Sequence, residues 1–233
     1  MKAQGKELNA QINLKAVNAR KIHYGKTETK RAIANVLMRI ISEYKFTSLT
    51  ALNSVLKLYN VAVDRGEKGS RTFLNNGLFY RILDENGNKT GVPIKASSIY
   101  MKPTLAYLEN KFEENKLLKK PHEKRIKTAI DWVINQKNLN ISDFKAELEK
   151  ENINTAFWKN KENTIYGITY VDHKTKCVFN GSELGKKYSA KAIIENCEQE
   201  LKIKDKVRLK PNKESIPIER NDRIISSSLS SLF

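Results

Sequence analysis

Three neighbouring stretches in the second half of the chain constrain the fold more than any other feature. INTAFWKN, ENTIYGITYVD and KCVFN, between residues 153 and 180, alternate or run apolar, and the polar segments NKEN and DHKTK separate them. Alternation with a period of two is typical of strands, and short polar links join strands that run in opposite directions. The sequence therefore predicts a three-strand antiparallel meander.

A second strand signal lies upstream. The run GLFYRILDENGNKTGVPIKA (77–96) contains two apolar stretches joined by Asn86-Gly87. Asn-Gly favours the tight two-residue turns of β-hairpins, so this run predicts a hairpin. The short strand NVAVD (60–64) precedes it, and EKGSR (67–71) between them is predicted to be a polar loop.

The remaining periodic segments have apolar residues at helical spacing. Thr27, Ser48, Pro103, Pro121 and Ser142 are the predicted helix-start residues, because hydroxyl side chains cap helices and proline suits a first turn. Another helix closes the domain after the meander. The chain is thus predicted to be α+β, with helices packed on a mainly antiparallel sheet made of a hairpin plus a three-strand meander.

The chain divides into one main domain and two ends. Its 233 residues are enough to bury a core. Residues 1–22 are polar with scattered apolar positions, residues 23–200 carry the periodic patterns, and residues 201–233 form a basic tail that ends in SSSLSSLF. We predict an α+β domain over residues 23–200.

The charge of the chain points to polyanions. Forty-three Lys and Arg residues against 26 Asp and Glu residues give a net charge of +17, with the excess concentrated toward the N-terminal end. Such a chain is attracted to nucleic acid, and salt weakens that attraction. The alternative is that many of the lysines serve solubility, as on any solvated helix face.

Nothing in the sequence predicts a metal or cofactor site. Cys177 and Cys197 form no CxxC pair and are predicted to be buried thiols, while His23, His122 and His173 stand alone in a loop, at a helix start and in a turn. The first 25 residues lack an apolar signal core, and no stretch approaches the roughly 20 apolar residues of a membrane span. These patterns predict a cytoplasmic protein with no membrane partner.

The segment NGSELGKKYSAK (180–191) raises the question of phosphate binding. A Walker loop needs G-x-x-x-x-G-K followed by Ser or Thr. Here Gly181 and Gly185 are one residue too close, and Lys187 stands where the hydroxyl should be. The segment is therefore not a nucleotide-hydrolysis motif.

The same segment still permits a simpler anion site. Ser182 and Ser189 are predicted to cap two helix starts, whose free N–H groups would lie beside Lys186, Lys187 and Lys191. Such an arrangement suits a backbone phosphate. The alternative is that the glycines make turns and the lysines are solvated.

Four blocks of sequence together resemble a known family. They resemble the part of mobilisation relaxases that follows the nuclease domain, and the likeness covers about residues 20–197. The blocks are YGKTETKRAIANVL (24–37), FTSLTALNSVLKLYNVAVDRG (46–66), GVPIKAS (91–97) and IYGITYVDHKTKCVFNGSELGKKYSAKAI (165–193).

The resemblance implies a role in mobilisation of plasmids or other mobile elements. In relaxases an N-terminal domain nicks DNA at the transfer origin with a tyrosine and a histidine-bound divalent metal. This chain lacks the His-hydrophobic-His pattern of that domain. We therefore expect it not to be catalytic alone, to hold no cofactor, and to be either a fragment of a longer relaxase or a truncated gene product.

Three functions compete at this stage. The first is a non-catalytic module that binds transfer-origin DNA, single-stranded or nicked, with Tyr80, Tyr100 or Tyr188 stacking on bases unless these tyrosines pack in the sheet. The second is a protein-interaction module that docks relaxosome proteins through the basic first helix or the tail. The third, ranked last, is a magnesium nuclease. The predicted DNA-binding residues are Arg65, Arg71, Lys95, Lys102, Ser182, Lys186, Lys187, Tyr188 and Lys191; the nuclease would use Asp64, Asp84, Glu85 or Asp172.

Overall fold

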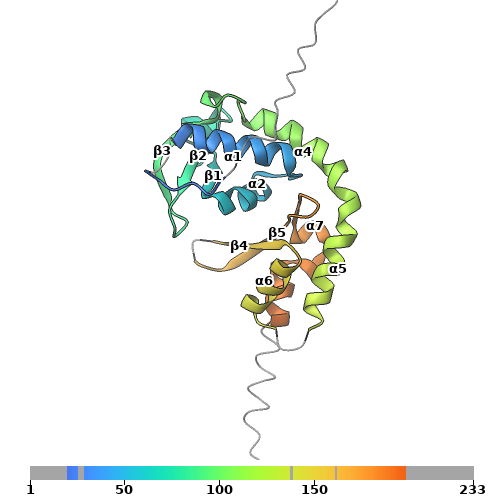
Figure 1. Cartoon of the computed structure of the whole chain (residues 1–233). Coiled ribbons are helices and arrows are strands. Elements are labelled where there is room, and N and C mark those ends of the chain that lie inside the picture. The colour runs from blue at the N-terminus through green and yellow to red at the C-terminus, as the bar shows by residue number, and fades with distance from the viewer. Residues whose placement is uncertain (1–19, 26–28, 137–138, 161, 198–233) are drawn as a thin grey trace, which may run out of the picture.

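The computed structural model describes residues 20–25, 29–136, 139–160 and 162–197. Within them the chain is α+β, with helices packed against two three-stranded antiparallel sheets (Figure 1). One sheet contains the predicted hairpin, and the other is the predicted meander. The predicted fold class is confirmed.

The first half of the chain builds one sheet and the helices around it. In chain order the elements are α1 (Thr29–Glu43), α2 (Leu49–Leu56), η2 (Lys57–Tyr59), β1 (Val61–Asp64), α3 (Arg71–Leu74), β2 (Phe79–Leu83), β3 (Lys89–Lys95), η3 (Ala96–Ser98) and α4 (Leu105–Lys119). The sheet has the order β1-β2-β3. Its hairpin turn is held by Asp84, whose carboxylate accepts from the backbone N–H groups of Asn86 and Asn88.

The second half builds the meander and covers one of its faces. Its elements are η4 (Lys120–His122), α5 (Glu123–Ile134), α6 (Ile141–Lys150), β4 (Ile153–Lys159), β5 (Ile165–Asp172), β6 (Cys177–Asn180), α7 (Gly181–Leu184) and η5 (Lys186–Tyr188). Residues 190–197 are helical as well. The sheet has the order β4-β5-β6, as the alternating pattern predicts.

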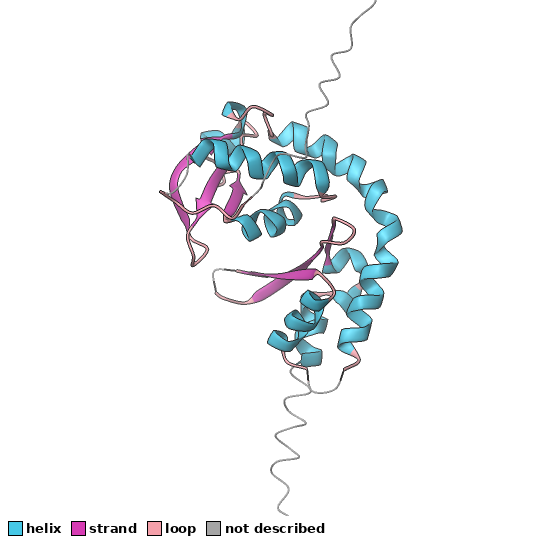
Figure 2. Cartoon of the chain, viewed as in Figure 1, coloured by secondary structure: helices cyan, strands magenta, loops and turns pink. Residues whose placement is uncertain are grey.

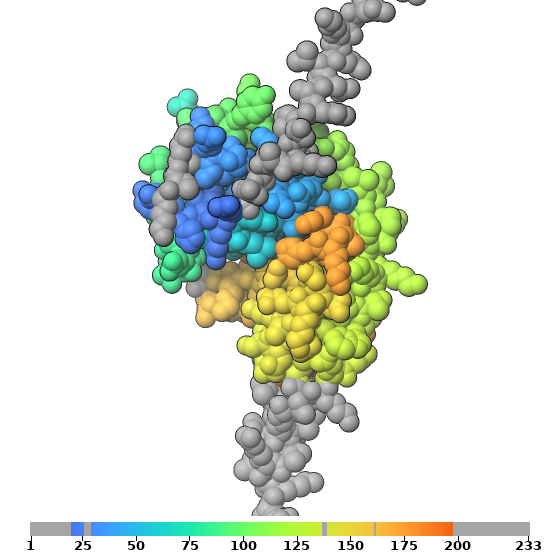
Figure 3. All heavy atoms as spheres, viewed as in Figure 1, coloured from blue at the N-terminus to red at the C-terminus, as the bar shows by residue number. Residues whose placement is uncertain are grey.

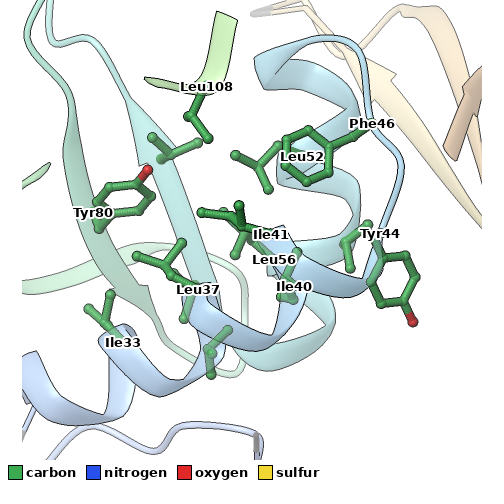
Figure 4. Packing of buried hydrophobic residues seen from close by; sticks show 14 of the residues in the cluster. Ile33, Leu37, Ile40, Ile41, Tyr44, Phe46, Leu52, Leu56, Tyr80 and Leu108 are labelled. Atoms are coloured by element: carbon green, nitrogen blue, oxygen red, sulfur yellow. The ribbon is translucent and has the colours of Figure 1, made fainter. Parts of the chain in front are cut away.

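The first hydrophobic core lies between α1, α2 and the β1-β2-β3 sheet (Figure 4). Ile33, Leu37 and Ile40 recur at helical spacing on α1, and all three are fully buried against α2 and the sheet. Leu108 adds a contact from α4. The amphipathic pattern of the sequence thus becomes the inner face of α1.

The meander lies between this core and a second one (Figure 2). Val171 and Val178 belong to the first core, whereas Tyr170 and Phe179, their neighbours on β5 and β6, belong to the second. Successive side chains of a strand point to opposite faces, so one sheet serves both cores. On the second face it packs against α5, α6 and the last helix.

A curved helical column joins the two halves along one side of the molecule (Figure 1). α4 and α5 follow each other through the 3-10 turn η4, which contains Pro121. Proline lacks the N–H group that a continuous α-helix would need at this position. Pro121 therefore interrupts the α-helical hydrogen bonding of the column and lies before α5 starts.

Some predicted helix starts are right and others are wrong. Ser48 caps α2 by accepting from the N–H of Ala51, as predicted. α4 begins after Thr104, so Pro103 lies outside its first turn. α6 is capped by Asn140 in a capping box with Asp143, in place of the predicted Ser142. The predicted cap Thr27 lies outside the described residues.

A partly buried chain of hydrogen bonds ties the end of α1 to the turn after β5. The hydroxyl of Tyr44 lies 2.6 Å from Nδ1 of His173, and Nε2 of His173 lies 2.6 Å from Oδ1 of Asn154. An amide oxygen only accepts, so Nε2 carries the proton and Nδ1 accepts from Tyr44. The space-filling view shows this turn packed against the first half of the molecule (Figure 3).

The hydrogen-bonded series Tyr44, His173 and Asn154 is expected to make the stability of the protein depend on pH. Burial, reinforced by the Lys176 ammonium, lowers the pKa of His173, and Asp172 opposes this only in part. The folded state therefore binds fewer protons here than the unfolded state. We expect this contribution to be complete above about pH 6.5, the pKa of an unfolded histidine, and to be lost as the pH falls below it.

Urea unfolding between pH 7.5 and 5 measures this effect against a His173→Gln variant, which retains polar groups but does not titrate there. We expect wild type to lose more of its unfolding free energy than the variant over this range. Equal losses in both proteins would contradict a neutral, half-buried His173.

Two further sequence predictions can be compared with the structure. Cys177 and Cys197 are both buried, as predicted. Within the described ranges, no helix combines the length and apolar character that crossing a bilayer requires.

Candidate nucleic-acid interface

The structure divides the predicted DNA-binding residues into two groups. Arg65, Arg71, Lys95 and Lys102 belong to the first half of the molecule, around the β1-β2-β3 sheet. The other predicted residues follow β6 in the second half; they are Ser182, Lys186, Lys187, Tyr188 and Lys191. The two groups differ in their surroundings, and two residues of the first group, Arg71 and Lys95, line a cavity.

The short helix α3 positions Arg71, one residue of the first group. Its start is capped by Ser70, whose hydroxyl accepts from the N–H of Phe73. Arg71 is therefore the first residue of a helix, and its predicted place in a loop is wrong. Beyond α3, Asn76 has a positive φ of 50°, which asparagine tolerates better than most residues.

Arg65 directly follows β1 and contacts both α3 and the turn after it. Its guanidinium donates to the side-chain oxygen of Asn76 at 2.7 Å and stacks over the ring of Phe73 at 4.4 Å. Both contacts hold α3 and the turn after it against the sheet. Arg65 is thus engaged with the protein itself, and it supports the cavity wall without lining the cavity.

A cavity of about 670 Å³ lies between α3, the end of β3 and the start of α4. We call it the basic cavity, because Arg71 and Lys95 both line it and its described wall contains no Asp or Glu. The other lining residues are Thr72, Asn75, Asn76, Gly77, Leu78, Phe79, Ala96, Ser97, Thr104 and Ala106. Lys95 is the last residue of β3.

The N-terminus of α4 opens into the basic cavity. α4 has 15 residues, and Thr104 and Ala106 from its first turn line the wall. The first N–H groups of a helix have no acceptor within the helix, and the helix dipole places partial positive charge there. The hydroxyl of Thr104 accepts from the N–H of Tyr107 in a long bond of 3.5 Å. The basic cavity therefore combines two cations with the positive end of a helix.

Lys102 lies in the turn that leads into α4. Its φ is +43°, and its carbonyl accepts from the N–H of Thr104 at 2.6 Å. Tyr100, nearby in the same turn, is 82% exposed and remains available for stacking. Tyr80 is fully buried and donates to the carbonyl of Pro103, so its predicted role as a stacking residue is wrong.

Both cations of the basic cavity are free to bind an anion. Arg71 and Lys95 are exposed, and their charged groups have no ion pair or hydrogen bond among the described residues. By contrast, Arg81 and Lys89 on the same sheet both pair with Asp64. Arg71 and Lys95, which line the cavity, are thus among the cationic side chains of this half that have no acidic partner.

The second group begins at a helix start that is already filled. Asn180 caps α7 and forms a capping box with Glu183, so the predicted cap Ser182 is wrong. Glu183 also binds the largely buried ammonium of Lys119 at 2.6 Å. A carboxylate of the protein thus occupies the place that a phosphate would take. The helix stops at Gly185, with φ +127°, as the sequence predicts.

The lysines that follow are partly neutralised. Lys187 binds Asp131 at 2.7 Å, and the Asp131 carboxylate raises the pKa of Lys187. The half-buried Tyr188 donates to the same carboxylate. Lys191 lies 3.8 Å from Glu195. Ser189 caps the last helix as predicted, by accepting from the N–H of Ala192.

The carboxylates considered for a magnesium site serve structural roles. Asp64 binds Lys89, and Asp84 holds the hairpin turn. Asp172 is fully buried and binds Arg125 and Thr175. Glu85 lies in the hairpin turn. Across the described residues, no three His, Cys, Asp or Glu side chains cluster at metal-binding distance.

Sequence reasoning missed the start of α4 as part of the site. Pro103 drew attention to the first turn, whereas Thr104 is the cap, and the Pro-Thr pair was a usable signal because proline is tolerated just before a capping residue. Asn75 and Asn76 gave no separate signal.

In comparisons with known proteins, the chain matches no family model, no curated protein and no solved structure.

Proposed function

We propose that this chain is a DNA-binding region of a mobilisation relaxase that acts without catalysis of its own. The single observation that carries DNA binding is the basic cavity, in which Arg71 and Lys95 meet the N-terminus of α4 with no acidic residue in the described wall. The net charge of +17 supports the same partner. The link to relaxases rests on the sequence resemblance alone.

The cavity suits a phosphate of the DNA backbone. Arg offers a planar fork of donors, Lys offers a compact charge, and free N–H groups at a helix start complete the set. Asn75, Asn76 and Ser97 add neutral polar groups to the wall. Contacts of this kind fix the position of DNA without reading its sequence. We place the protein in the cytoplasm, where transfer-origin DNA is processed.

Replacing both cations tests the proposal. We expect Arg71→Ala/Lys95→Ala to weaken DNA binding and to lower the slope of log affinity against log salt by about 1.8 for duplex DNA, since each phosphate contact contributes about 0.9. Fluorescence anisotropy with a labelled transfer-origin oligonucleotide, at several salt concentrations, measures both quantities.

Two matched variants serve as controls. Arg71→Lys/Lys95→Arg keeps both charges and should keep the slope. Lys186→Ala/Lys187→Ala removes two lysines of the second group, and its effect should be smaller because Asp131 already pairs with Lys187. Wild-type affinity and slope in the Arg71/Lys95 double-alanine variant would disprove the cavity as the binding site.

The alternative, a protein-interaction module of the relaxosome, has one observation in its favour. Leu117 and Leu118 on α4 are 77% and 54% exposed. Adjacent exposed leucines at the surface of a helix are a recurring feature of protein-binding sites. A chain that binds no DNA at low salt would leave this alternative as the better proposal.

A further inference from the structure

The outer face of α5 carries an exposed tryptophan beside a second cavity. Trp132 is 58% exposed, whereas Ile126, Ile130 and Val133 on the inner face are fully buried. A cavity of about 600 Å³ adjoins the ring, and its lining residues are Lys124, Arg125, Thr128, Ala129, Trp132 and Glu151. We call this surface the Trp132 shelf.

Trp132 is not among the residues of the second core. Lys124, Thr128 and Trp132 are spaced four residues apart, so they lie in one row along the helix. The row faces away from the second core, and the indole has no hydrogen bond, ring contact or cation contact among the described residues. The other tryptophan, Trp158, donates to Thr169 and lies under Lys57 at 4.2 Å.

We propose that the Trp132 shelf stacks one unpaired nucleobase of bound DNA. This inference rests on the proposed function and adds a preference for single strands. The flat indole face and the methyl group of Ala129 offer an apolar surface, and every base has a face that can stack on it. In an intact duplex the bases are paired and stacked on each other, so the shelf cannot take them.

The charges around the shelf fit this occupant. Lys124 is exposed and has no ion pair among the described residues, so it is free to bind the phosphate next to a stacked base. Arg125 is held by Asp172 and by the carbonyl of Glu151. The Glu151 carboxylate, which also pairs with Lys174, offers an acceptor for an amino group of a base.

Other occupants fit less well. A second copy of this chain would bring together two molecules that each carry a net charge of +17, which opposes association. An apolar peptide would leave the charged rim, Lys124 and Glu151, without partners. A strand of DNA supplies both a flat apolar ring and, on the adjoining phosphate, a negative charge.

Fluorescence of Trp132 tests the inference directly. The chain has two tryptophans, so Trp158→Phe leaves Trp132 as the sole source of indole emission. We expect oligothymidylate to quench this emission as it binds, and a blunt duplex of equal length to bind without quenching. Saturable binding of oligothymidylate, seen by anisotropy, with unchanged emission would overturn the proposal.

Affinity provides the second arm. Trp132→Ala should weaken binding of oligothymidylate about tenfold, within the range for loss of one stacked base, and leave duplex binding unchanged. Trp132→Phe should retain most of the affinity. Tyr166→Ala removes another aromatic side chain, 67% exposed, and is the matched control with no expected effect. Lys124→Ala should lower the single-strand salt slope by about 0.7.

The outcomes separate this inference from the proposed function. If wild type binds neither DNA form at low salt, both fall together. If wild type binds both forms and Trp132→Ala changes neither affinity, only the shelf is disproved. Conversion of a wild-type dimer to a monomer by Trp132→Ala, measured by sedimentation, would also overturn the shelf by identifying a second copy as its occupant.

Discussion

Gly181→Ala should lower the free energy of unfolding by about 3 kcal/mol, at the upper end of the usual cost of overpacking, and Gly181→Val should lower it further. A Cβ atom at this position would lie 2.3 Å from the carbonyl oxygen of Tyr188 and 2.6 Å from Cγ2 of Ile168. The first of these is a backbone atom, which cannot rotate away. The φ angle of Gly181 is not in the left-handed region, so close approach is the reason for glycine here.

Urea unfolding with a matched glycine measures this effect. Gly167→Ala introduces the same methyl group on β5, where the nearest atom, Cδ1 of Trp158, is 3.6 Å away. We expect this control to change the free energy of unfolding by less than about 1 kcal/mol. Similar losses in both variants would show that Gly181 is not specially confined.

Asp172→Ala should be the most damaging change of a charged residue, costing about 3 kcal/mol, because it breaks a buried ion pair and leaves Arg125 without its main partner. The carboxylate is fully buried and accepts from Arg125, from the hydroxyl of Thr175 and from the N–H of Lys174. These contacts join α5 to the turn between β5 and β6.

The double variant Asp172→Leu/Arg125→Met separates two costs. One is the loss of the ion pair, and the other is leaving the Arg125 charge without its partner. The double variant should recover part of the stability that Asp172→Ala loses, since neither charge is then buried alone. Lys116→Ala, at an exposed pair with Glu113, should change stability by less than about 0.5 kcal/mol. No recovery in the double variant would contradict this account of Arg125.

The strands could be predicted from the sequence because their signals are local. Alternation in β4 and β5, and Asn86-Gly87 between β2 and β3, are each encoded within a few residues. The helix caps were harder, because several capping residues stand side by side. Between Asn180 and Ser182, for example, the choice depends on the reach of Glu183 to the backbone of Asn180.

The candidate site was predictable only in part, because it is formed by residues that are distant in the sequence. Net charge indicated a polyanion, and Arg71 and Lys95 were both among the predicted residues. Their meeting at one cavity depends on the register of β2 and β3, where Phe79 pairs with Lys95, and on the packing of α4. Trp132 was not predicted at all, although its spacing from Ile126 and Ile130 on the buried face places it on the opposite side of the helix.

The meander that serves two cores sets the order in which this protein can fold during synthesis. Val171 and Val178 complete the first core, but they are made after the rest of that core, whose other members end at Leu108. A nascent chain therefore carries the first half with one apolar side uncovered until β6 leaves the ribosome. Translation through the second half must precede full burial of the first, which makes this interval the one in which a chaperone or a binding partner has access to that side.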